Sequence, residues 1–105
     1  MRVVILESAQ TDLMALRGYI VKNFSTTTWK ATYAKLKTAI RNLAMFPYLG
    51  GMPDELASLN LTQYRQVLSG MNRIICEVRH EVVYVHLIVD TRRDLKDVLM
   101  QRLLR

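Results

Sequence analysis

The sequence has 105 residues, 50% of them apolar, and its fifteen Lys and Arg against nine Asp and Glu give a net charge of +6. A chain of this length fits one domain, spanning residues 1–105. Its apolar content excludes a disordered chain and a fold that depends on metals or disulfides in place of a core. The positive charge favours an anionic partner, such as nucleic acid or an acidic protein.

Two features of the sequence favour the cytoplasm. The apolar N-terminal stretch meets Glu7 directly after Leu6 and is too short for a secretory signal. No segment approaches the roughly 18 apolar residues of a membrane span. The single cysteine, Cys76, lies among apolar residues and is predicted to be an inert core residue.

The first half of the chain predicts a strand and a helical hairpin. Residues 3–6 are typical of a buried strand, and Ser8 is expected to cap the helix that follows. The apolar side of that helix carries Leu13, Leu16, Ile20 and Phe24. Ser25 is expected to cap a second, antiparallel helix, whose apolar residues are Trp29, Tyr33, Leu36, Ile40 and Leu43. Pro47, Gly50 and Gly51 then predict a loop of about a dozen residues.

The second half predicts a meander and a last helix. Apolar residues alternate over residues 64–68, 72–79 and 82–89, which indicates three strands, with His80-Glu81 as a two-residue turn. Asp94 is expected to cap a final helix with Leu95, Val98, Leu99 and Leu103 on its apolar side. The order β-α-α-β-β-β-α predicts an α+β fold with an antiparallel-rich sheet, on one face of which the helical hairpin and the C-terminal helix pack.

An uninterrupted register from the His80-Glu81 turn places Ile75 opposite His86 and Arg73 opposite Ile88. Arg73, Glu77, Tyr84 and His86 would then share the open sheet face, and Ile74, Cys76, Val78, Val83, Val85, Leu87 and Val89 would lie under the helices. The simplest interpretation of the open face is an ion pair of Arg73 with Glu77 on a solvated surface. Arg65, Arg92 and Arg93 lie near enough to Arg73 in this arrangement to focus positive charge into one groove.

The sequence predicts no metal or cofactor. His86 has no Ser, Cys or second His placed for a catalytic relay, and the two histidines do not have a zinc-like spacing. Gly50-Gly51 is not followed by the lysine and hydroxyl of a phosphate-binding loop.

Several stretches together carry a family resemblance. Tyr64-Arg65, residues 72–78, residues 83–89 and Asp90-Thr91-Arg92-Arg93-Asp94 resemble the C-terminal half of RelE/ParE toxins of type II toxin–antitoxin systems. The helical hairpin ending at residues 43–50 resembles the ParE branch, so the resemblance covers essentially the whole chain. It implies a toxin that a cognate antitoxin, ParD-like or RelB-like, neutralises within a hetero-oligomer.

The resemblance leaves the molecular target open. The RelE branch cleaves mRNA on the ribosome, and Arg65, Arg73 and Arg93 match cations that would stabilise its transition state. Val67 and Leu99, however, occupy the places of a second lysine and of a last-helix tyrosine. The ParE branch poisons DNA gyrase and needs no catalytic residue, and it is the favoured interpretation. A degenerate, non-toxic antitoxin partner or a plain nucleic-acid-binding module is the third.

The residues expected to bind the target or the antitoxin gather on the predicted open face, at its end and on the last helix. They are Arg65, Arg73, Tyr84, His86, Arg92, Arg93, Lys96 and Arg102. Tyr19, Trp29 and Tyr33 of the helical hairpin are either anchors for the antitoxin or core residues.

Overall fold

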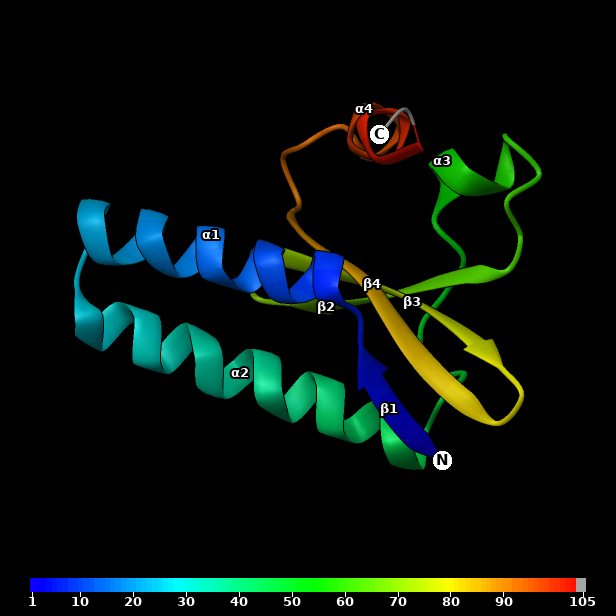
Figure 1. The fold of residues 1–105 in the computed structure, drawn as a ribbon, viewed down its shortest axis with the longest axis horizontal. Coiled ribbons are helices and arrows are strands. Elements are labelled where there is room, and N and C mark those ends of the chain that lie inside the picture. The colour runs from blue at the N-terminus through cyan, green and yellow to red at the C-terminus, as the bar shows by residue number, and fades with distance from the viewer. Residues whose placement is uncertain (104–105) are drawn as a thin grey trace.

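The computed structural model describes residues 1–103, which form one α+β unit around a four-stranded sheet (Figure 1). Its elements are β1 (Arg2–Ile5), α1 (Glu7–Asn23), α2 (Thr26–Met45), α3 (Asp54–Ala57), β2 (Tyr64–Ser69), β3 (Asn72–Arg79), β4 (Val82–Asp90) and α4 (Leu95–Leu103). The strand order is β1-β4-β3-β2, with β1 parallel to β4 and the other pairs antiparallel. The predicted fold class and element order are confirmed, and the short helix α3 is an addition within the predicted loop.

The two helices of the hairpin differ in how their N-termini are capped. The Ser25 hydroxyl accepts a hydrogen bond from the Thr28 backbone N–H at 3.0 Å, so the predicted cap of α2 is confirmed. The predicted Ser8 cap of α1 is wrong, because α1 begins after Leu6 with no side-chain cap. Ser8 lies inside the first turn, and its hydroxyl donates to the His86 carbonyl at 3.0 Å, which ties α1 to β4.

The first core lies between the helical hairpin and the sheet. Its buried members are Ala9, Leu36, Leu43, Ile74, Cys76, Val83, Val85 and Ile88. Cys76 is 1% exposed, and burial raises the pKa of its thiol to about 11, which confirms the predicted inert core residue. Phe24 was expected on the apolar side of α1, but it follows the helix and is 65% exposed.

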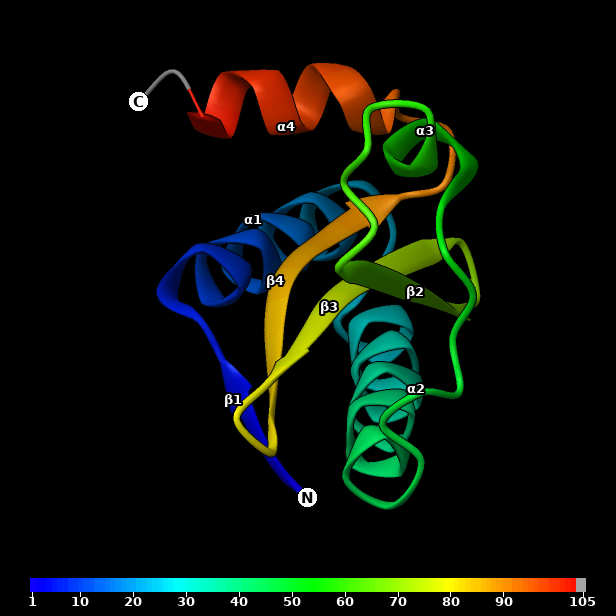
Figure 2. The same cartoon turned by 90° about the vertical axis from the view of Figure 1, so that its right-hand side faces the viewer.

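The second face of the sheet is covered as well. Figure 2 shows α3 and α4 next to each other on the side of the sheet away from α2. The second core consists of Leu56, Ile75, Leu87, Val89, Leu95 and Val98. The Asp94 carboxylate accepts from the Lys96 backbone N–H at 2.9 Å, as predicted for a cap of the last helix. The expectation that all helices pack on one face is therefore wrong. The side chain of Leu103, predicted on the apolar side of α4, lies outside the described part.

A β-bulge at His86 explains why the second face needs a cover. The turn forms as predicted, with positive φ angles of 50° at His80 and 62° at Glu81, which suit a two-residue hairpin. Cys76 still opposes Val85, but Ile75 opposes Leu87, so that His86 is an extra residue in β4. Because one inserted residue reverses the side-chain alternation beyond it, Leu87 and Val89 join the second core. The predicted pairings of Ile75 with His86 and of Arg73 with Ile88 are wrong.

No helix within residues 1–103 is long and apolar enough to cross a membrane.

Candidate functional site

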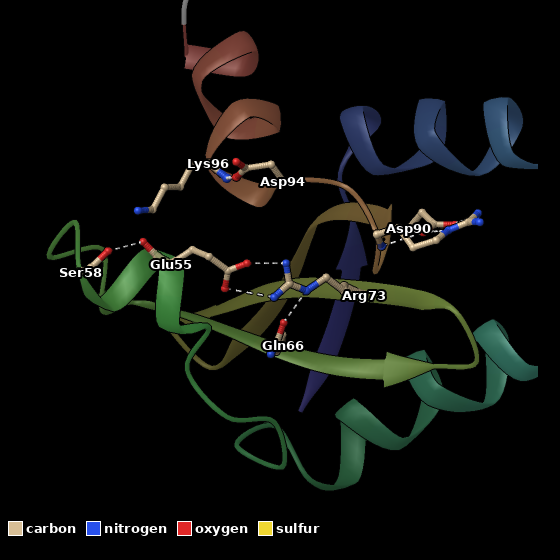
Figure 3. Close-up of polar contacts among 8 residues, drawn as sticks. Glu55, Ser58, Gln66, Arg73, Asp90, Asp94 and Lys96 are labelled. Atoms are coloured by element: carbon tan, nitrogen blue, oxygen red, sulfur yellow. Dashed lines mark hydrogen bonds and ion pairs between the residues drawn. The ribbon is translucent and has the colours of Figure 1, made fainter.

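Arg73 is bound from two sides on the face that α3 and α4 cover. Its guanidinium donates to both carboxylate oxygens of Glu55 at 2.8 and 3.1 Å, and its Nε donates to the Gln66 side chain at 2.9 Å. Figure 3 shows Arg73 between these two residues, which come from α3 and β2. The hydrogen bonds from Arg73 hold the pKa of Glu55 below its usual range. Arg73, whose side chain is 12% exposed, thus fastens α3 to the sheet.

Arg65 lies on the opposite face. It pairs with Cys76 in the sheet register, and its guanidinium donates to the carbonyls of Tyr48 at 3.3 Å and Gly50 at 2.8 Å. The guanidinium also stacks on the Tyr48 ring, 5.1 Å from its centre. A Cβ atom at Gly50 would come within 2.1 Å of the Gln66 carbonyl oxygen, so only glycine fits this close approach. Arg65 therefore holds the loop after α2 and does not meet Arg73.

His86 and Tyr84 take part in a second polar cluster. His86 Nε2 and Glu77 Oε1 are hydrogen-bonded at 2.8 Å, and the Tyr64 ring packs edge-on against the imidazole at 5.3 Å. Arg79 stacks on Tyr84, 4.9 Å from the ring centre. The predicted Arg73–Glu77 pair is wrong, because Arg73 bonds to Glu55 and Glu77 bonds to His86. The cluster nevertheless places an acid and a base in direct contact.

The cations after β4 differ in their partners. Arg92 donates to both carboxylate oxygens of Asp90 at 2.9 Å, which lowers the pKa of Asp90, while its own side chain remains 72% exposed. Arg93 is exposed, and no hydrogen bond or ion pair within residues 1–103 involves its guanidinium. Lys96 is exposed on the first turn of α4, and its charge helps to lower the pKa of Glu55.

Arg102 is a structural contact between α4 and α1. Its guanidinium forms an ion pair with Asp12 and donates to the His86 carbonyl at 3.2 Å. The Asp12 carboxylate also accepts from the Ile88 backbone N–H at 3.0 Å. Since β1 pairs only with residues 82–85 of β4, these side chains satisfy backbone groups at the edge of β4 that β1 does not reach.

A groove runs along α1, at the end of the molecule where β4 ends. It consists of two adjoining cavities of about 340 and 650 Å³. Both cavities are lined by Leu16, Tyr19, Asn72, Asp90 and Arg92. Ile20, Phe24, Lys35, Ser69 and Met71 line the first cavity, and Asp12 and Arg93 line the second. We call this hollow the α1 groove.

The structure brings only part of the predicted site together. Arg92 and Arg93 share the α1 groove, whereas Arg65, Arg73 and His86 lie elsewhere, each with its own partners. Sequence reasoning missed Ser69 and Asn72, and the only signal for them was their place as polar residues where the predicted strands 64–68 and 72–79 meet. Of the hairpin aromatics, Trp29 is buried at 9% exposure, whereas Tyr19 and Tyr33 are exposed at 53% and 39%. No three potential metal ligands gather within residues 1–103.

Residues 3–95 match the family model described as the ParE toxin of the type II toxin–antitoxin system parDE. The chain belongs to the ParE toxin family. No curated protein sequence is significantly similar to it. A solved structure from P. aeruginosa, described as a chromosomal ParDE toxin–antitoxin system, has the same fold, with a TM-score of 0.71 at 14% identity. The alignment covers 86% of this chain and 95% of that one.

Two positions of the ParE fold bear on the comparison with RelE-type nucleases. Val67 packs against the first core, and Leu99 packs against the second. They occupy the places where the resemblance to RelE would put a lysine and a tyrosine. Both positions therefore contribute to stability in this ParE family member.

Proposed function

We propose that this ParE family toxin inhibits growth by poisoning DNA gyrase through binding, and that a cognate ParD-type antitoxin neutralises it. The observation that carries the proposal is the separation of Arg65 from Arg73. Arg65 holds loop carbonyls on one face of the sheet, and Arg73 is bound to Glu55 on the other.

This separation matters because phosphoryl-transfer catalysis needs cations aimed together at one phosphate. Arg73 would have to leave a two-bond carboxylate contact to serve there, and Arg65 would have to release the loop. An inhibitor that acts by binding has no such requirement. Its cations need only be exposed and complementary to an acidic partner.

The exposed cations after β4 are the groups that we assign to target binding. Arg93 and Lys96 have exposed side chains, and Arg92 remains accessible beside Asp90. They lie at the end of β4 and the start of α4, so that one partner surface can contact all three. The proposed target, a cytoplasmic enzyme, agrees with the localisation expected from the sequence.

The experiment is a gyrase cleavage assay with purified toxin, supercoiled plasmid and ATP, with linear DNA as the readout. We expect linear DNA to accumulate with the wild-type toxin and to fall when Arg93 and Lys96 are both replaced by alanine. Arg41→Ala, an exposed cation on α2, is the matched control and is expected to act like the wild type. Ribosomal A-site mRNA cleavage without linear DNA would contradict the proposal.

A second candidate function rests on the contact of Glu77 with His86. A hydrogen-bonded carboxylate and imidazole at 2.8 Å can exchange roles as acid and base, as a RelE-type endoribonuclease requires. This function predicts ribosome-dependent mRNA cleavage that His86→Ala and Glu77→Gln abolish. If the wild type is inactive in both assays yet binds its antitoxin, the result supports the third hypothesis from the sequence, which is a degenerate, non-toxic partner of the antitoxin.

A further inference from the structure

The longest stretch of the sequence without a charged residue, residues 42–53, ends α2 and continues into the loop before α3. Five large apolar side chains of this stretch are exposed to solvent. They are Met45, Phe46, Tyr48, Leu49 and Met52, with exposed fractions of 75%, 56%, 59%, 63% and 45%. We call these five residues the loop patch. An uncharged, apolar stretch is expected to be buried, so its exposure calls for an explanation.

The loop that carries the patch is held to the sheet by several contacts. The Arg65 guanidinium donates to the carbonyls of Tyr48 and Gly50 and stacks on the Tyr48 ring. The Gln66 backbone N–H donates to the Gly51 carbonyl at 2.8 Å. The exposure of the patch is therefore fixed by the fold. A surface that is already ordered loses less conformational entropy when a partner binds to it.

The composition and size of the patch are those of a protein-binding surface. Methionine and aromatic residues are enriched in the cores of such surfaces. Side chains of this size bury about 150–250 Å² each when fully covered, so five that are about half exposed leave on the order of 500 Å² of apolar surface. A patch of about 300–600 Å² is the largest that a monomeric protein usually exposes, and it often has a binding function.

The absence of charge in the patch selects its partner. Arg65, the cation that contacts the loop, is bound to loop carbonyls, so an acidic partner finds no free cation among the five patch residues. The cations that we assign to the target lie after β4, whereas Figure 2 shows the end of α2 and the loop at the opposite end of the molecule. Two copies of a chain with a net charge of +6 repel each other over most of their surfaces, but no charges oppose each other where two patches meet.

We propose that the loop patch is the contact surface of a weak, reversible homodimer, in which two copies pack their patches together about a twofold axis. In such a contact the same residues of both copies face each other, and the flexible side chains of Met45 and Met52 fill the space around Phe46 and Leu49. Two patches bury about 1,000 Å² in total, which is at the low end for a specific interface and fits a dissociation constant on the order of tens of micromolar. The inference goes beyond the proposed function and depends on neither gyrase nor the antitoxin.

The test is sedimentation equilibrium of the purified toxin at concentrations from about 1 to about 300 µM, which bracket the expected dissociation constant. The average mass of the wild type is expected to rise from that of the monomer towards twice that value. Phe46→Glu with Leu49→Glu places four carboxylates in the dimer contact and is expected to weaken the dimer at least tenfold. Met14→Glu with Met100→Glu changes two exposed apolar residues on α1 and α4 by the same charge and is the matched control, expected to dimerise like the wild type.

The salt dependence of the mass separates an apolar contact from a contact between charges. Raising the salt concentration from about 0.1 to about 0.5 M screens the repulsion between two basic copies, so the dimer is expected to tighten. A dimer held by ion pairs would instead dissociate, and that result would overturn the loop patch as its contact. Circular dichroism melting confirms that each variant folds. Leu49→Glu alone, at a residue that is 63% exposed, keeps the test valid if the double variant does not fold.

A wild-type toxin that remains monomeric over the whole concentration range would overturn the proposal. A folded Phe46→Glu, Leu49→Glu variant that dimerises within about twofold of the wild type would overturn it too, as would equal weakening by the control variant. A monomeric wild type whose gyrase poisoning or antitoxin binding is lost in the double variant would assign the patch to that partner and not to a second copy. The mass measurement contains no gyrase, so its failure and that of the proposed function are distinguishable.

Discussion

The face covered by α3 and α4 and the α1 groove both contain polar side chains, but these have different partners. On the covered face, Arg73 is bound by Glu55 and Gln66, and His86 is bound by Glu77. In the groove, Ser69 and Asn72 have no hydrogen-bonding side-chain partner within residues 1–103. Polar groups that satisfy one another stabilise the fold, whereas polar groups that keep access to the solvent of a groove are available to a ligand. Charge alone does not distinguish the two regions, because each contains arginines.

The largest expected effect is on the covered face. Arg73→Ala removes the partner of Glu55 and is expected to lower the free energy of unfolding by about 2–4 kcal/mol, because a partly buried carboxylate loses its two hydrogen bonds. Urea unfolding measures this loss. Arg79→Ala, whose side chain is 55% exposed, is the control and is expected to cost less than about 1 kcal/mol. Equal losses for the two variants would show that Arg73 does not fasten α3.

The next largest loss of stability is expected from breaking the contact between α4, α1 and β4. Asp12→Ala leaves the Ile88 N–H without its acceptor and removes the ion pair of Arg102, which keeps only its bond to the His86 carbonyl, and the expected cost is about 1–3 kcal/mol. Asp97→Ala, an exposed acid on α4 with no ion pair in the described residues, is the control. Hydrogen exchange at the Ile88 amide would rise in Asp12→Ala, and an unchanged exchange rate would contradict the role of Asp12.

Acid should weaken the covered face through Glu55. Its pKa in the folded chain lies below the ordinary value of a glutamate, chiefly because Arg73 hydrogen-bonds to it. The stability contributed by this pair is therefore fully present above that value and is lost as the pH falls through the folded pKa. Glu55→Gln is expected to be less stable than the wild type at neutral pH and to lose less stability on acidification. Parallel stability curves for both proteins would contradict this linkage.

Replacing either of two serines by alanine is expected to have the smallest effect on stability, and the two variants give the most direct comparison. Ser8→Ala removes the hydroxyl that donates to the His86 carbonyl and is expected to cost about 1 kcal/mol. Ser69→Ala removes a hydroxyl without a protein partner and is expected to change the free energy of unfolding by less than about 0.5 kcal/mol. Thermal and urea unfolding of both variants measure the difference. A larger loss for Ser69→Ala would mean that this hydroxyl serves the fold.

The sequence predicts the elements well where local patterns are strong. The α2 stripe, the Ser25 cap, the His80-Glu81 turn and the Asp94 cap each depend on residues close in the chain, and all four form. The helix α3 was missed because its four residues are too few to show the apolar periodicity of a helix. The Ser8 cap failed because the strand ends and the helix begins within two residues, so that Ser8 falls inside the first turn.

Local patterns thus determined the α+β class, the helical hairpin, the meander and the inert setting of Cys76. Only the tertiary structure decided which face each strand residue occupies, because the bulge at His86 shifts the register by one and carries Leu87 and Val89 to the face under α4. The tertiary structure also decided which groups the arginines contact. Arg73 meets Glu55, eighteen positions earlier in the chain, and Arg65 meets loop carbonyls on the opposite face. Such contacts depend on how distant segments pack, and no local periodicity encodes that.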